Sequence, residues 1–241
     1  MKNIIVANWK MNPSTSKEAS DIFNAVKMGV EGFNNVKVVV CPPFVYLPLL
    51  KGLSLGAQNV SYEEKGSYTG EVSPLQLRDL GVEYVILGHS ESRKHFNDTD
   101  EIVNKKVKES LHEGLRPFFC LGEKEGENRE QLLENQIKIG LSGVSAEDFK
   151  NIIIAYEPVW AIGTGKNCPV GELQNAVLFI KKIISDLFRQ EVSENLTIIY
   201  GGSVNSQNSR EYLKEGGVNG LLVGGASLKS EEFIKIVESS K

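Results

Sequence analysis

Cysteine is scarce in this sequence of 241 residues. The three cysteines, Cys41, Cys120 and Cys168, lie far apart and form no C-x-x-C pair. Disulfide frameworks use an even number of cysteines, and tetrahedral metal sites use closely spaced ones, so this pattern argues against both. We therefore expect a reducing compartment and predict a cytoplasmic location.

Long apolar runs are missing as well. No segment approaches the ~20 apolar residues that a membrane-spanning helix needs. The short apolar run 4–7 reaches Asn8, Trp9 and Lys10 too early to be the core of a signal peptide. The sequence thus predicts no membrane partner and no secretion by this route.

The sequence also lacks an excess of positive charge. The net charge is −4, and the Lys and Arg residues are scattered, so a nucleic-acid partner is not expected. No Pro- or Ser-rich linker, charge run or low-complexity segment divides the chain. The hydrophobic share of 41% and the charged share of 24% are typical of a folded protein. We predict a single domain over residues 1–241.

Short runs rich in β-branched and other apolar residues recur along the chain. Their apolar continuity, without polar alternation, indicates strands that are buried on both faces of a parallel sheet. The predicted strands contain residues 4–6, 38–40, 53–57, 84–87, 118–120, 152–154, 197–199 and 221–223, of which 53–57 is the weakest.

Amphipathic helices lie between these runs. The clearest spans 170–190, where Leu173, Val177, Ile180, Ile184 and Leu187 repeat every three or four residues after Pro169. Similar patterns mark helices around residues 22–26, 103–111 and 233–237, and Ser73 and Thr99 look like helix starts. Strand and helix alternate about eight times.

Such a chain can form either an open doubly wound sheet or a closed (β/α)8 barrel. Unusual residues gather directly after the predicted strands, at 8–10, 89–91, 157 and 201–203. Because a barrel brings the carboxyl ends of all its strands around one mouth, this placement favours the closed barrel. The predicted fold class is α/β, a single closed (β/α)8 barrel.

Glycines follow the last two predicted strands, at 201–202 and 224–225, and also occur at 163 and 165. A Walker loop would need Gly at Trp160 and Ser or Thr at Asn167, and a dinucleotide fingerprint would need Gly at Cys168, so neither nucleotide motif is present. Glycine-rich turns after the last barrel strands commonly bind phosphate. The alternative is that these glycines only permit tight turns.

Three side chains could carry chemistry. Glu157 follows the apolar run 152–156, where desolvation suits a carboxylate to act as a general base. His89 follows Gly88 at a strand end and could donate a hydrogen bond, and Lys10 could meet an anion. Each has an ordinary alternative: an ion-paired or solvated glutamate, a structural histidine and a surface lysine. Together they fit proton abstraction next to a carbonyl group.

Neither metal nor cofactor is predicted. The three histidines show no H-E-x-x-H or comparable spacing, and His95 and His112 lack a strand-end position, so both are interpreted as structural residues.

The sequence resembles the triosephosphate isomerase family from the first predicted strand to the last. The resemblance lies in the motifs Ala7-Asn8-Trp9-Lys10-Met11-Asn12, Gly88-His89-Ser90-Glu91, Ala155-Tyr156-Glu157-Pro158-Val159-Trp160-Ala161-Ile162-Gly163-Thr164-Gly165, Tyr200-Gly201-Gly202-Ser203 and Val223-Gly224-Gly225-Ala226-Ser227.

The resemblance implies interconversion of dihydroxyacetone phosphate and D-glyceraldehyde 3-phosphate through an enediolate, with no cofactor. Glu157 is then the base, a neutral His89 polarises the carbonyl, and Lys10 stabilises the anionic substrate. Asn8 lies beside Lys10, and Glu91 supports the site. The implied phosphate ligands are backbone groups of Gly163, Ser203 and Gly225, with Gly224 adjacent.

The resemblance also implies a closing lid and a homodimer. Ile162 and Leu222 are expected to cover Glu157, Tyr200 and Ser203 to latch the lid, and the loop 68–71 to insert into a second subunit. The implied lid comprises Pro158, Val159, Trp160, Ala161, Ile162, Gly163, Thr164, Gly165, Lys166, Asn167 and Cys168.

Three positions depart from the family pattern. Ser92 replaces the first of two usual arginines, which predicts that a local ion pair is lost or replaced. Asn167 and Cys168, followed by Pro169, replace the usual Thr-Ala at the end of the lid and are expected to change its opening. Asp98 stands where many members carry Glu, which puts one buried interaction in question.

Two alternatives remain beside the isomerase. Another phosphate-binding barrel enzyme would keep the glycine-rich turns without needing Asn8, Lys10, His89 and Glu157 together. A non-catalytic sugar-phosphate-binding barrel predicts the loss of at least one proton carrier, and none is missing here.

Overall fold

A computed structural model describes residues 2–163 and 165–240. Eight parallel strands close into a barrel in chain order, with β8 beside β1. This confirms the closed barrel over the open sheet. The strands are β1 (Asn3–Asn8), β2 (Val36–Cys41), β3 (Ser54–Ala57), β4 (Val82–Leu87), β5 (Arg116–Leu121), β6 (Ile153–Tyr156), β7 (Thr197–Gly202) and β8 (Gly220–Val223).

The strands are buried on both faces, which explains their continuous apolar character. Alternate residues point into the barrel or outward to the helices, as Val6 and Ile5 do on β1. The inner cluster consists of Ile4, Val6, Val39, Cys41, Tyr84, Ile86, Phe118, Cys120, Ile153, Ala155, Ile199 and Leu222. The predicted strand segments lie in these elements, except that Leu53 and Ile152 precede theirs by one residue.

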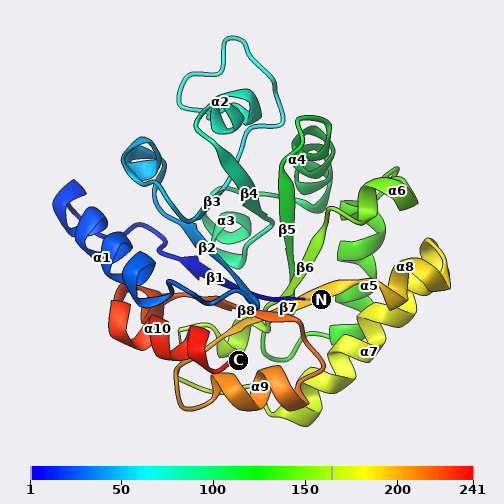
Figure 1. The fold of residues 1–241 in the computed structure, drawn as a ribbon. Helices are drawn as coiled ribbons and strands as arrows, with labels where there is room; N and C mark the ends of the chain where they lie inside the picture. Colours follow the sequence, from blue (N-terminus) through cyan, green and yellow to red (C-terminus); the bar gives the residue numbers. More distant parts are fainter. Residues whose placement is uncertain (1, 164, 241) are drawn as a thin grey trace.

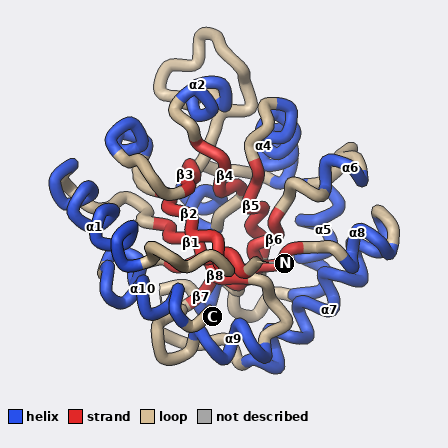
Figure 2. The backbone as a smooth tube through the Cα atoms, in the orientation of Figure 1, coloured by secondary structure: helices blue, strands red, loops and turns tan. Residues whose placement is uncertain are grey.

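Helices surround the barrel, as the ribbon and the tube show (Figures 1 and 2). The α-helices are α1 (Ser16–Gly29), α2 (Pro74–Asp79), α3 (Ser90–His95), α4 (Asp100–His112), α5 (Arg129–Gly140), α6 (Ala146–Phe149), α7 (Val170–Leu187), α8 (Gln190–Glu194), α9 (Ser209–Glu215) and α10 (Ser230–Glu238). Three 3-10 helices are η1 (Phe44–Leu49), η2 (Val159–Ala161) and η3 (Gly225–Leu228).

The predicted helices are present, with one correction. Ser73 and Thr99 cap α2 and α4 through their side chains. The helix predicted over 170–190 ends at Leu187, and Leu187 is exposed instead of continuing the buried stripe of Leu173, Val177 and Ile184. The chain breaks there and starts the short helix α8.

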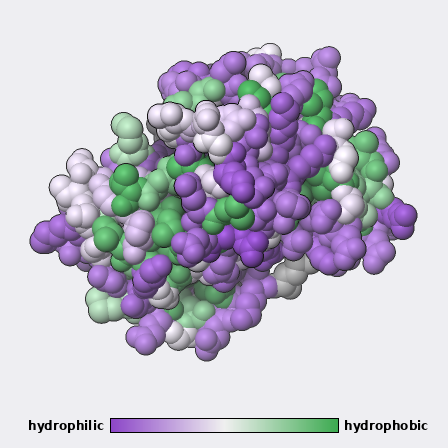
Figure 3. Space-filling model, turned by 90° about the horizontal axis from the view of Figure 1, so that it is seen from above, coloured by the Kyte–Doolittle hydropathy of each residue, from purple (hydrophilic) through white to green (hydrophobic). Residues whose placement is uncertain are grey.

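The parallel order places all carboxyl strand ends, and the loops that follow them, at one end of the barrel. Seen from the side of loop 58–73, the surface is mainly hydrophilic with separate apolar patches (Figure 3). Among the described helices, none is long and apolar enough to cross a membrane.

Candidate active site

A cavity of about 320 Å³ opens at the carboxyl ends of the strands. It brings together residues from loops after β1, β4, β6, β7 and β8 that are far apart in the sequence. The predicted site residues that line it are Asn8, Lys10, His89, Glu157, Ile162, Gly163, Gly165, Asn167, Ser203, Leu222, Gly224 and Gly225. Glu91 does not line this cavity but contacts Lys10, and Thr164 lies outside the described residues.

Lys10 is held in an unusual backbone conformation. Its φ of 54° lies in the left-handed region, which non-glycine residues seldom adopt. The Lys10 N–H donates to Asn8 Oδ1 at 3.1 Å, and Gln58 Nε2 donates to the Lys10 carbonyl at 2.8 Å. Gln58 was missed by the sequence analysis, although it directly follows β3 as other site residues follow their strands.

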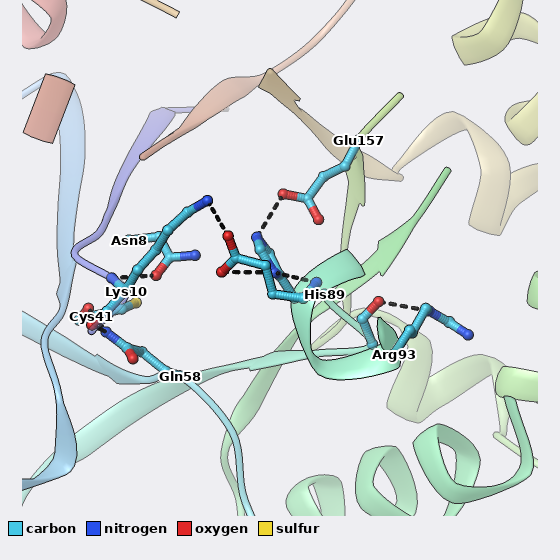
Figure 4. A network of polar contacts seen from close by, with 9 residues as sticks. Asn8, Lys10, Cys41, Gln58, His89, Arg93 and Glu157 are labelled. Atoms are coloured by element: carbon cyan, nitrogen blue, oxygen red, sulfur yellow. Dashed lines mark hydrogen bonds and ion pairs between the residues drawn. The ribbon is translucent and has the colours of Figure 1, made fainter. Parts of the chain in front are cut away.

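Glu91 fixes the other end of Lys10. Its Oε1 accepts a hydrogen bond from Lys10 Nζ at 2.6 Å (Figure 4). Partial burial raises the pKa of Glu91, but the hydrogen bond and charge of Lys10, helped by His89 and His95, outweigh burial and leave the pKa below its ordinary value. Glu91 is therefore ionised at neutral pH.

His89 precedes α3, and its Nδ1 accepts a hydrogen bond from the backbone N–H of Glu91 at 3.2 Å. The other ring nitrogen, Nε2, lies 3.4 Å from Glu157 Oε1 (Figure 4). His89 is buried and can present one N–H to a ligand in the cavity.

Glu157 is buried, with 4% of its surface exposed. Its backbone N–H donates to the Leu121 carbonyl at 2.8 Å, which anchors the residue at the end of β6. Oε1 faces His89, whereas Oε2 is buried without a hydrogen-bond partner in the described chain. A solvated glutamate is thus excluded. Glu157 also separates the cavity from a larger one of about 790 Å³ that extends toward α3 and α5.

Two glycines make room for Glu157. A Cβ atom on Gly201 would lie 2.8 Å from Cγ and 2.9 Å from Oε1 of Glu157. A Cβ atom on Gly122 would lie 1.9 Å from the Glu157 carbonyl oxygen. Gly201 was predicted only as part of a phosphate turn, and Gly122 was not singled out at all. Both positions need glycine because Glu157 approaches their backbones closely.

The glycine-rich turns line the end of the cavity opposite β4. The first, residues 201–203, ends β7, and the second, at Gly224 and Gly225, starts η3. A Cβ atom on Gly225 would meet nothing within 4 Å. The first N–H groups of a helix lack intrahelical partners and suit an anion. The two glycine-rich turns and Lys10 therefore line the same cavity.

Residues 159 and 160, near the start of the predicted lid 158–168, are held by Glu123. The buried Glu123 carboxylate accepts hydrogen bonds from Tyr156 OH at 3.1 Å and from Trp160 Nε1 at 3.1 Å. Its backbone carbonyl accepts from Val159 N at 2.8 Å. Sequence reasoning missed Glu123, which follows β5 by two residues.

The two residues expected to latch the closed lid differ in their contacts. Ser203 Oγ donates to the carbonyl of Ala161, a residue of the predicted lid, at 2.7 Å. The hydroxyl of Tyr200 has no hydrogen-bond partner among the described residues. Tyr212 instead donates to the Cys168 carbonyl at 2.9 Å, with its ring centroid 4.5 Å from that of Tyr200.

Two ion pairs lie at or beside the departing positions 92 and 98. Arg93 Nε donates to the Gly88 carbonyl at 2.7 Å, and Nη1 pairs with Asp100 at 2.5 Å, beside a buried Ser92. The buried Asp98 pairs with Lys106 Nζ at 2.8 Å. The shorter side chain at 98 therefore still holds a buried ion pair.

The other two histidines do not line the cavity that holds Lys10 and Glu157, although His95 lines the larger cavity beside it. His95 is exposed at the end of α3, and His112 is exposed at the end of α4. His112, Glu109 and Glu113 form one compact group of possible metal ligands in the described chain. Glu113 already pairs with Arg78 and His112, and the group is not part of the cavity.

Comparison with known proteins shows the family to which the chain belongs. The family model described as triosephosphate isomerase matches residues 3–240. Among curated proteins named triosephosphate isomerase, the chain is 47% identical to that of Alkaliphilus oremlandii, with 98% of each chain covered. It is 44% identical to that of Dictyoglomus thermophilum over 99% of each chain, and 45% identical to that of Dehalococcoides mccartyi over 98% of this chain and 96% of the relative. The chain therefore belongs to the triosephosphate isomerase family.

Proposed function

We propose that this enzyme interconverts dihydroxyacetone phosphate and D-glyceraldehyde 3-phosphate. The observation that carries the proposal is the placement of Glu157, whose buried carboxylate lies 3.4 Å from His89 Nε2 in a cavity that also holds Lys10 and two glycine-rich turns. The names of the relatives support the choice of substrate.

Glu157 is the proton carrier. It removes a proton from the carbon next to the carbonyl, and the C–H electron pair becomes the C=C bond of an enediolate while the carbonyl electrons move to oxygen. Glu157 then returns the proton to the former carbonyl carbon, and the C=C electron pair forms the new C–H bond. The hydroxyl proton on the other carbon passes to the former carbonyl oxygen, and the electron pair it leaves forms the new C=O bond, which completes the isomerisation. The unpartnered Oε2 supports this role, since a buried oxygen without a partner is free to accept a proton.

His89 and Lys10 stabilise the charge that develops on oxygen. The Nε2–H of His89 donates to the substrate oxygens, and its orientation is supported by the bond from Glu91 N to Nδ1. The ammonium of Lys10, held by Glu91, favours both the anionic substrate and the enediolate, and the backbone of Lys10 is held by Asn8.

The phosphate binds at the glycine-rich turns. Backbone N–H groups of Gly163, Ser203 and Gly225, with Gly224 adjacent, are the proposed donors. Residues 158–168 close over the bound substrate, and Ile162 and Leu222, which line the cavity, cover Glu157 and exclude water.

The functional unit is a homodimer. Exposed apolar side chains lie in loops after four neighbouring strands: Met11 after β1, Val45 after β2, Tyr68 after β3 and Phe96 after β4. Consecutive strands place these loops side by side at the mouth end of the barrel. Figure 3 looks onto the side of loop 58–73 and shows apolar patches there. Exposed apolar side chains that gather in neighbouring loops are typical of a protein contact.

The enzyme is a single barrel domain that works in the cytoplasm. The barrel uses strands from Asn3 to Val223, and α10 packs against α1, which supports one domain over residues 1–241. All three cysteines are free and buried, which supports a reducing compartment.

A coupled spectrophotometric assay tests the activity. With D-glyceraldehyde 3-phosphate as substrate, the dihydroxyacetone phosphate formed is reduced by an added NADH-dependent dehydrogenase. We expect NADH to be consumed, and we expect inorganic sulfate to inhibit this reaction competitively. Sulfate binding without turnover would favour the non-catalytic barrel. A protein that neither binds sulfate nor turns over the substrate would contradict the proposed phosphate site as well.

A further inference from the structure

Two residues of the α9 region contact the C-terminal part of the lid and have no role in the mechanism above. Asn208 precedes α9, and Tyr212 lies one turn into it. We propose that Asn208 and Tyr212 are positioning residues that hold the C-terminal end of the lid and couple it to the phosphate turn 201–203. This inference rests on the proposed function of that turn and of the lid.

Tyr212 fixes the point at which the lid meets α7. Its side chain is 2% exposed, and its hydroxyl donates to the Cys168 carbonyl at 2.9 Å. Pro169 follows, with a φ set by its ring and no N–H, and α7 starts at Val170. The bond from Tyr212 therefore holds the last flexible peptide before a rigid helix.

Asn208 bridges the lid and the phosphate turn with one amide group. Its Nδ2 donates to Asn167 Oδ1 at 3.3 Å and to the Ser203 carbonyl at 2.9 Å. Its Oδ1 accepts from Asn205 N at 2.9 Å, which fixes the orientation of the amide. Asn208 and Tyr212 are four residues apart, the spacing that places side chains on one helix face.

Ser203 extends this connection to the other end of the lid, because its hydroxyl donates to the Ala161 carbonyl at 2.7 Å. A phosphate bound to the Ser203 N–H would order Ser203. Ser203 contacts the N-terminal end of the lid directly, at Ala161, and the C-terminal end through Asn208, which contacts Asn167. Without the two α9 contacts, the lid has more conformations to lose when it closes, so closure is less favourable.

Tyr212→Phe and Asn208→Ala test this coupling, since the first keeps the ring and removes only the hydroxyl. A neutral hydrogen bond changes an equilibrium by roughly two- to tenfold. We expect kcat/KM to fall by about this factor and inhibition by inorganic phosphate to weaken in parallel. The fluorescence change of Trp160 on phosphate addition should also shrink; Trp160 lies in the lid, and the second tryptophan, Trp9, is buried in the barrel.

Ser193→Ala is the matched control. Ser193 Oγ donates to the Lys181 carbonyl at 2.7 Å, a hydroxyl-to-carbonyl bond between α8 and α7 at the opposite end of the barrel. It should lower the thermal midpoint while leaving kcat, KM and phosphate inhibition unchanged.

The coupling is wrong if both α9 variants keep wild-type kinetics and phosphate inhibition, or if they lose only thermal stability as the control does. A wild-type protein without isomerase activity, in which the variants still weaken phosphate binding, would overturn the proposed reaction and leave the coupling in place.

Discussion

The two carboxylate oxygens of Glu157 have different surroundings. One faces His89, and the other is buried without a partner among the described residues. A buried polar atom left unsatisfied costs about 1–3 kcal/mol, so such an atom needs an explanation. A ligand that supplies a proton to this oxygen provides one, and the arrangement is thus better suited to a reactive group than to a structural one.

Glu157→Gln tests that interpretation. The amide is nearly isosteric, so the fold and phosphate binding should persist, while the proton acceptor is lost. General-base catalysis typically contributes ~10²–10⁴-fold, and we expect kcat to fall at least this much. Steady-state kinetics together with circular dichroism provide the measurement. A variant that retains more than about a tenth of wild-type kcat would show that another group carries the proton.

Gly201→Ala should displace the same carboxylate without removing it. The new Cβ atom would lie 2.8 Å from Glu157 Cγ, so either Glu157 or β7 must move. We expect kcat to fall more than tenfold, because small misplacements of a catalytic group cost about a hundredfold. Gly171→Ala is the control, since a Cβ there meets nothing within 4 Å in α7 and should leave kcat unchanged. Equal kinetics for the two variants would contradict the role of Gly201.

The Lys10–Glu91 pair predicts a pH dependence. Because the pKa of Glu91 is lowered in the folded state, its ionised form stabilises the protein above the ordinary glutamate range. This contribution is lost as the pH falls through the lowered pKa. Glu91→Gln should therefore weaken the acid dependence of unfolding below about pH 4.5. Denaturant unfolding curves between pH 3 and pH 7 measure it, and parallel curves for the two proteins would contradict it.

At the scale of elements, the lid is fastened at both ends by residues outside it. Glu123, after β5, accepts from Tyr156, Trp160 and Val159, and α9 holds Asn167 and Cys168. The proposed lid is thus held near both ends, so we expect its closure to depend on how firmly each end is held.

Glu123→Gln weakens the first support. The carboxylate accepts from two side-chain donors, whereas an amide offers one accepting oxygen, so one hydrogen bond is lost or weakened. Hydrogen bonds to charged groups are worth about 1.5–3 kcal/mol, which corresponds to roughly a ten- to hundredfold change. We expect kcat to fall within this range and the Trp160 emission to shift. Unchanged emission together with unchanged kcat would show that Glu123 does not control the lid.

The elements were predictable from sequence where burial alone defines them. Continuous apolar runs located the eight strands, and the stripe of Leu173, Val177 and Ile184 located α7. Short helices such as α3 and α8 have too few turns for a periodic pattern. Their existence depends on contacts with the rest of the barrel, which no local pattern contains.

The cavity residues Lys10, His89 and Glu157 were predictable because each closely follows a strand. Gln58, Glu123 and Tyr212 were missed because each acts through a backbone or side-chain partner distant in sequence. The choice between Tyr200 and Tyr212 as the residue that contacts the lid depends on where two hydroxyl groups lie in space, which the motif around Tyr200 does not specify.

At the scale of the whole molecule, the loops after different strands carry different parts of the proposed site. The loops after β6, β7 and β8 carry the lid and the glycine-rich turns, and the loops after β1 and β4 carry Lys10 and His89. The loops after β1 to β4 also expose apolar side chains. A second subunit on that side would lie against the segments that position Lys10 and His89, so assembly and catalysis should be linked.

Phe96→Asp tests this link, since Phe96 is 73% exposed directly after α3, whose N-terminus holds His89. A charge placed in an apolar subunit contact should dissociate the dimer and lower kcat, because the loops that hold Lys10 and His89 lose their support. Sedimentation velocity and kinetics at matched concentrations provide the measurement. Leu178→Asp is the control, since Leu178 is 66% exposed on α7, away from these loops, and should change neither mass nor kcat. A wild-type protein that sediments as a fully active monomer would rule out the dimer.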